Sequence, residues 1–91
     1  MEEINKDSCF IGRYFKQVVQ MRRINRQVLA RRLGFDYTDN DRMMCFFFKK
    51  KDYLWKQFEI EKWCGVLGIS EDKPIYTKLM DRAGIKNYDY D

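Results

Sequence analysis

Hydrophobic residues near the start of the chain recur with helical spacing. The apolar positions of the first run stand at i, i+4, i+7 and i+8, namely Ile11, Phe15, Val18 and Val19. Polar side chains, among them Lys16, Gln17 and Gln20, fill the positions between them. On a helix with 3.6 residues per turn these apolar positions form a single stripe. The pattern therefore predicts an amphipathic helix with one buried face.

A second, shorter helix is expected directly after the first. Asn25 stands where a side-chain oxygen can accept hydrogen bonds from the first backbone N–H groups of a helix. Val28, Leu29 and Leu33 would form its apolar face. Gly34 is placed to adopt the left-handed conformation that commonly ends a helix. The two runs together predict a pair of packed helices that leads into a turn.

The next apolar run, Met43 to Phe48, precedes three consecutive lysines and is ambiguous. A helix made from it would be apolar on every side, which implies burial all round. A strand would suit its aromatic content, and periodicity alone does not decide between the two. The helices expected on either side favour a helix.

Two more helices complete the expected fold. One runs from about Trp55 to Leu67 and ends near Gly68; its stripe consists of Ile60, Trp63, Cys64 and Leu67. The other begins near Pro74 and stops at Gly84, with Ile75, Leu79 and Ala83 facing inward. The prediction is an all-α, compact bundle of four to five helices in a single domain, residues 1–91. Residues 1–9 would form an N-terminal arm and residues 85–91 a frayed acidic tail.

Charge is distributed unevenly along the chain. The net charge is +4, but residues 1–11 and residues 52–91 each sum to −2, so residues 12–51 carry +8. In that central segment eleven basic residues face only Asp36, Asp39 and Asp41. A local excess of this kind is expected of a phosphate-binding surface, although a solvated face that keeps the protein soluble would also produce it.

Several classes of function lack their residues in this sequence. The chain has no histidine, and its three cysteines, Cys9, Cys45 and Cys64, show no CxxC spacing, so neither a metal nor another cofactor is expected. Phosphate-loop, HExxH and nucleophile-elbow motifs are missing, so an enzyme is not expected, and each cysteine is interpreted as a small buried hydrophobe. No apolar run approaches the 18 or so residues that span a bilayer. A reducing, cytoplasmic location away from membranes fits these features.

The first two predicted helices resemble the helix-turn-helix of the Cro and phage-repressor-like family, the XRE-type regulators. Arg26, Ala30 and Gly34 match the 1, 5, 9 spacing of that motif, in which the small residue lets the helices approach and the glycine makes the turn. Other positions in register are Ile11, Gly12, Phe15, Lys16, Val18, Ile24, Asn25, Leu29 and Leu33. Further on, Ile60, Trp63, Cys64, Leu67, Gly68, Ile69 and Ser70 resemble the closing helix of the family.

The resemblance departs from the family pattern at the turn. The family has a branched apolar residue six positions after the glycine, where this chain has Asn40. A recognition helix that starts three or four residues later would instead bring Met43 or Met44 to the anchoring position. The sequence therefore predicts an enlarged turn, FDYTDND, before the recognition helix. Its three aspartates would be repelled by phosphates.

The resemblance implies a duplex-DNA-binding protein, expected to regulate transcription. Family contacts to the DNA backbone come from the start of the second helix and from the loop after the third, which here correspond to Arg22, Arg23, Arg26, Gln27, Lys49, Lys50 and Lys51. The candidates for reading bases are Thr38, Asn40 and Arg42. The alternative is a helical interaction module of a phage or mobile element, on a scaffold that no longer reads DNA, whose MMCFFF segment and basic rim bind an acidic protein partner.

A homodimer is also expected, because the family reads two half-sites about one helical turn apart. Apolar residues crowd more than one face of the fourth predicted helix and its approach: Tyr53, Leu54, Trp55, Phe58, Ile60 and Trp63. One core covers only one of these faces, so the surplus resembles an interface. Alternatively, the fifth helix folds back and covers the second face within one chain.

Overall fold

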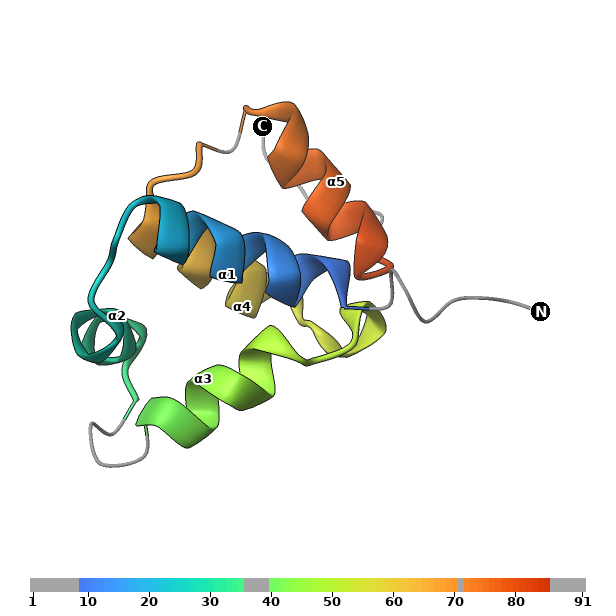
Figure 1. Ribbon diagram of the computed structural model, residues 1–91. Helices are drawn as coiled ribbons and strands as arrows, with labels where there is room; N and C mark the ends of the chain where they lie inside the picture. Colours follow the sequence, from blue (N-terminus) through green and yellow to red (C-terminus); the bar gives the residue numbers. More distant parts are fainter. Residues whose placement is uncertain (1–8, 36–39, 71, 86–91) are drawn as a thin grey trace.

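Five α-helices make up most of the part of the chain that the structure describes. In this computed structural model they are α1 (Phe10–Met21), α2 (Arg26–Leu33), α3 (Asn40–Phe48), α4 (Gln57–Leu67) and α5 (Pro74–Arg82), and a 3₁₀ helix, η2 (Asp52–Leu54), precedes α4 (Figure 1). The described residues are 9–35, 40–70 and 72–85. Those ranges contain no strand, so the all-α prediction is confirmed. The expected N-terminal arm and acidic tail lie almost entirely outside them.

α1 is the predicted amphipathic helix, and its first turn is held by a residue far along the chain. All four residues of the predicted stripe are buried. The residue before the helix, Cys9, makes no side-chain cap. Instead, the buried N–H of Ile11 donates a 2.9 Å hydrogen bond to Oδ1 of Asp52 in η2. Oδ2 of the same carboxylate lies 3.8 Å from Nε of Arg82 at the end of α5. Asp52 therefore ties the start of α1 to η2 and α5.

We expect Asp52→Ala to lower the free energy of unfolding by about 1–3 kcal/mol. The change removes the acceptor that caps the first turn of α1 and so leaves the buried Ile11 N–H without that acceptor. Asp52→Asn keeps an oxygen acceptor and should cost less. Urea unfolding followed by circular dichroism measures both variants. Asp81→Ala, at an exposed position of α5, is the control; an equal loss there would contradict the capping role.

The N-terminal part of α1 crosses the C-terminal end of α3 at very short distance. A Cβ atom built on Gly12 would lie 2.4 Å from the carbonyl oxygen of Phe48 and 2.7 Å from that of Phe47. One turn earlier, Sγ of Cys9 donates to the carbonyl oxygen of Lys49 at 3.2 Å. The partly positive start of α1 thus faces the partly negative end of α3, an attractive arrangement of helix dipoles. Only glycine at position 12 permits this approach.

α2 begins and ends where the sequence predicts. The Asn25 side chain accepts hydrogen bonds from the N–H groups of Gln27 (2.8 Å) and Val28 (3.2 Å). Gly34 follows the helix with a φ of 88°, in the left-handed region. The expected apolar face is wrong at one position, because Val28 is 39% exposed while Ala30 is fully buried. The buried residues of α2 are those that face α3 and α4, and Val28 lies outside that arc.

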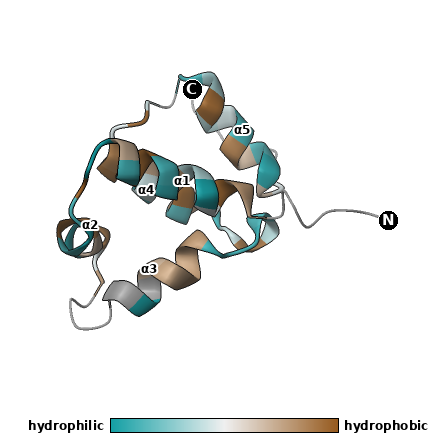
Figure 2. Cartoon of the chain, in the orientation of Figure 1, coloured by the Kyte–Doolittle hydropathy of each residue, from teal (hydrophilic) through white to brown (hydrophobic). Residues whose placement is uncertain are grey.

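The Met43 to Phe48 run is helical, as favoured, but it is not buried all round. Met44 and Phe48 lie in the core, whereas Cys45 is exposed and Phe46 is 58% exposed. The reason is that α3 packs on α1 and α2 and, through the rings of Phe47 and Phe48, on Trp63 of α4, so the side of α3 away from these helices is left exposed. In Figure 2 the middle of α3 is coloured as hydrophobic although part of it faces outward. Met44, one of the two methionines expected to anchor this helix, is fully buried, and the side chain of Met43 lies outside the described part.

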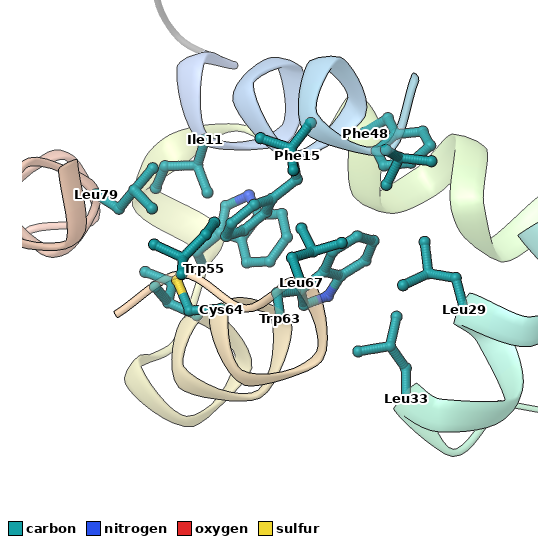
Figure 3. Close-up of a cluster of buried hydrophobic side chains, with 14 of the residues drawn as sticks. Ile11, Phe15, Leu29, Leu33, Phe48, Trp55, Trp63, Cys64, Leu67 and Leu79 are labelled. Carbon is teal, nitrogen blue, oxygen red and sulfur yellow. The ribbon is translucent and has the colours of Figure 1, made fainter. Parts of the chain in front are cut away.

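The core is built around a cluster of large aromatic rings. Trp63 of α4 stacks on Phe15 of α1 with ring centroids 5.2 Å apart, and its ring also meets Trp55 at 5.9 Å and Phe48 at 5.7 Å. Figure 3 shows these side chains between the helices, with leucines of α2 on one side and Leu79 on the other. The predicted stripe of α4 is buried as expected. The cluster therefore joins α1, α3 and α4 into one core.

α5 buries a wider face than its sequence pattern indicates. Leu79 is buried as predicted, but Tyr76 and Met80 are buried as well, while Ile75 and Ala83 are only half-buried. The inward face was predicted incompletely because α5 contacts both α1 and α4 and so covers more than one stripe.

The apolar surplus that suggested a dimer is partly used inside the chain. Trp55, Ile60 and Trp63 are buried, and Tyr53, Leu54 and Phe58 remain exposed. These three do not form one patch. Tyr53 and Leu54 line a hollow beside α3, while Phe58 lines a separate crevice that Leu33 and Trp63 also border.

Candidate nucleic-acid interface

The basic central segment of the sequence folds into α1, α2, α3 and the residues that follow α3. α2 and α3 pack on each other on the side of the molecule away from α5 (Figure 1). From residue 12 to residue 35 the chain has seven basic residues and no carboxylate. The positive charge of the sequence is therefore concentrated in the part made of α1, α2 and α3, whereas the segment that holds α4 and α5 is slightly negative.

The start of α2 presents exposed groups able to contact phosphates. Arg26 and Gln27 are the first two residues of the helix and both are exposed. Arg23, also exposed, precedes them in a left-handed conformation with a φ of 52°. The Asn25 cap fixes the direction in which the chain enters the helix. These residues are suited to the backbone-anchoring role expected from the sequence.

Arg22 has a structural partner, unlike its neighbours. Its guanidinium Nη1 donates a short hydrogen bond to the carbonyl oxygen of Leu67, the last residue of α4. Arginine near a helix C-terminus satisfies a carbonyl that has no partner in the helix and interacts favourably with the helix dipole. Arg22 thus links the end of α1 to the end of α4, and we leave it out of the candidate anchors.

The outward side of α3 and the residue after it carry two apolar groups between two cations. Exposed residues stand at i, i+3, i+4 and i+7, namely Arg42, Cys45, Phe46 and Lys49. No ion pair or hydrogen bond of the Arg42 or Lys49 side chain is found with another described residue. Of the three candidate base readers, Arg42 is therefore on an accessible face. Thr38 lies outside the described residues; Asn40 is the first residue of α3, but its side chain lies outside the described part.

The three consecutive lysines after α3 differ in their surroundings. Lys49 and Lys51 are exposed. The Lys50 side chain is only 9% exposed, and its Nζ forms a 2.8 Å ion pair with Oε1 of Glu59. It also lies 5.1 Å from the ring centroid of Phe47 and 5.4 Å from that of Trp55, within reach of cation–π attraction. Lys50 is thus engaged within the fold, and only Lys49 and Lys51 remain as candidate anchors here.

Sequence reasoning missed a hollow at the end of α3. It has a volume of about 530 Å³, and its lining residues are Arg42, Cys45, Phe46, Lys49, Lys50, Lys51, Tyr53 and Leu54. Cations and exposed apolar side chains meet there, and none of the described residues that line it is a carboxylate. The signal in the sequence was a pair of lysines, Lys49 and Lys51, between the aromatic residues Phe46 and Tyr53 at the end of an apolar helix.

The cysteines have different environments. Burial, with a further contribution from the Glu61 carboxylate, raises the pKa of the Cys64 thiol to about 12. This thiol stays protonated at neutral pH and acts as an apolar core side chain, as predicted. Cys45 is exposed, so the expectation of burial is wrong for that residue.

The described residues contain no cluster of three or more Cys, Asp or Glu side chains that would hold a metal ion. None of their helices combines the length and apolar character required to cross a bilayer.

Comparison with known proteins gives no relative from which a role could be transferred. No family model, curated protein or solved structure matches this chain.

Proposed function

We propose that this protein binds duplex DNA through α2 and α3 and regulates transcription. The observation that carries the proposal is the exposure of cations in three places: Arg23 and Arg26 at the α1–α2 turn, Arg42 on α3, and Lys49 and Lys51 after α3. α3 has Arg42 near its start and Lys49 and Lys51 after its end. Cations in these two places suit a helix that lies in a DNA groove, because a phosphate backbone borders the groove on each side. The sequence resemblance to the Cro and phage-repressor-like helix-turn-helix supports the same function.

Each side chain has a proposed role. Phosphates are anchored by Arg26 and Gln27 at the start of α2, by Arg23 just before that helix, and by Lys49 and Lys51 after α3. Arg42 reaches a base edge from the exposed face of α3, where arginine pairs most often with guanine. Thr38 and Asn40 remain candidate readers.

Self-association is part of the proposal. A two-fold dimer would place two α3 helices at neighbouring half-sites and double the base contacts of this small domain. The function also implies a reducing, cytoplasmic setting.

The proposal is tested by the salt dependence of binding to a duplex of random sequence, measured by fluorescence anisotropy. Each phosphate contact contributes about 0.9 to the slope of log affinity against log salt concentration. We expect Arg26→Ala and Lys49→Ala each to weaken binding and to reduce the slope by about one unit.

The matched control is Lys73→Ala, which removes an exposed cation at the start of α5. This variant should leave the slope unchanged. An equal reduction in all three variants would mean that any surface cation contributes and that α2 and α3 are not the binding surface. Undetectable binding of the unaltered protein at low salt would overturn the proposal.

A further inference from the structure

The hollow beside α3 has an exposed apolar floor. Phe46 of α3 is 58% exposed, and Tyr53 and Leu54 of η2 are 67% and 46% exposed. Together with Cys45 they line one continuous depression. Its volume of about 530 Å³ lies within the range of ligand sites and is large enough to take one or two large side chains. Isolated apolar side chains are ordinary on protein surfaces, but several that line one hollow mark a binding site.

Cations surround this floor. Arg42, Lys49 and Lys51 are exposed, and no carboxylate among the described residues pairs with them. Lys50 lies beneath the floor, where its ion pair with Glu59 and the rings of Phe46 and Phe47 hold it in place. The floor is thus held by fixed groups, while the cations at its edge have no partner of opposite charge among the described residues.

We propose that the hollow lined by Cys45, Phe46, Tyr53 and Leu54, with Arg42, Lys49 and Lys51 at its edge, docks an acidic segment of a protein partner. The segment inserts an aromatic or aliphatic side chain into the hollow, and its carboxylates pair with the three cations. Burial of the apolar side chain supplies most of the affinity, and the charges orient the segment.

The lining disfavours two other occupants. A second copy of this chain would bring the same cations against one another, and like charges brought together at an interface are repelled. For nucleic acid, the cations at the edge of the hollow can pair with phosphates, but the Phe46 and Leu54 side chains of the floor offer a base edge no hydrogen-bonding group. The apolar floor is better matched by a side chain than by a base edge. This proposal goes beyond DNA binding and does not rest on it.

The test uses the full chain labelled with ¹⁵N and a short synthetic peptide rich in Asp and Glu that carries one Trp and one Leu. Amide shift changes on titration should cluster at residues 42–54. Two matched peptides separate the contributions: one has Ser in place of Trp and Leu, and the other has Asn and Gln in place of the acids. Each should bind at least about tenfold more weakly, because one lacks the apolar side chains and the other lacks the carboxylates.

Protein variants make the same separation. Phe46→Ser with Leu54→Ser should weaken binding of the acidic peptide about tenfold or more, as should Lys49→Glu with Lys51→Glu. Phe58→Ser removes an equally exposed ring outside the hollow and should leave the affinity unchanged. Thermal melting by circular dichroism checks that every variant is folded.

Three results would overturn the proposal. The first is binding of the acidic peptide without shift changes at residues 42–54, or no binding at all. The second is equal binding of the peptide without Trp and Leu, which would reduce the interaction to charge. The third is that an oligothymidylate shifts the same amides when the acidic peptide does not, which would assign the hollow to single-stranded nucleic acid. Loss of duplex-DNA binding in the salt experiment, with peptide docking intact, would overturn only the DNA proposal.

Discussion

Trp63→Ala is expected to lower the free energy of unfolding by about 3–5 kcal/mol, the usual cost of removing a large aromatic side chain from a core. The Trp63 ring is 2% exposed and stacks on Phe15, with Trp55 and Phe48 around it. Alanine leaves a cavity among rings from α1, α3 and the segment before α4, and these rigid groups collapse poorly into it. Domains of this size have a total stability of about 5–15 kcal/mol, so this one substitution should remove a large share of the stability.

The control for this prediction lies in the same helix. Phe58 of α4 is 64% exposed, and Phe58→Ala should change the stability by no more than about 0.5–1 kcal/mol. Urea unfolding monitored by far-ultraviolet circular dichroism gives both values. Similar losses in the two variants would mean that the aromatic cluster around Trp63 is not the centre of the core.

Gly12→Ala is expected to destabilise the protein by about 1–3 kcal/mol or more, although alanine favours helices. The new methyl group would stand 2.4 Å from the Phe48 carbonyl oxygen and 2.7 Å from that of Phe47, and both are backbone atoms. α1 and α3 must therefore separate, which weakens the packing of Phe15 and Phe48 on Trp63. The lost contacts outweigh the gain in helix propensity of about 1 kcal/mol.

Gly65→Ala provides the matched control, because Gly65 also lies inside a helix but has no neighbour within 4 Å of the added Cβ. There the gain in propensity acts alone, and the melting temperature should rise by a few degrees. The two substitutions are chemically identical, but Gly12→Ala should lower the stability and Gly65→Ala should raise it. A stabilising Gly12→Ala would show that α1 and α3 do not meet as closely as described.

Features that depend on neighbouring residues could be predicted from the sequence. The Asn25 cap, the left-handed Gly34 and the stripe of α1 all lie within one or two helical turns, so their effects are visible in the residues themselves. The Met43 to Phe48 run was ambiguous because its apolar residues occupy every direction. Its exposed side became known only from the positions of α1 and α2, which no local pattern specifies.

The candidate site shows the same division. Three consecutive lysines are equivalent in a sequence, and only the approach of Glu59 and the aromatic rings separates Lys50 from Lys49 and Lys51. Likewise, Arg22 was grouped with the anchors because nothing nearby in the sequence reveals the carbonyl of Leu67. Long-range partners thus decide which cations remain available, and a sequence pattern identifies only the segment that carries them.

The hydrogen bond between Ile11 and Asp52 also bears on the order of folding. It joins residues 41 positions apart, so it forms only after the chain between them has closed into a loop, and that closure has an entropic cost. α1 by itself lacks a side-chain cap and is short enough to be marginal as an isolated helix. During synthesis the first helix therefore acquires its stable start only after η2 has been made, and folding of the N-terminal half waits for the second half of the chain.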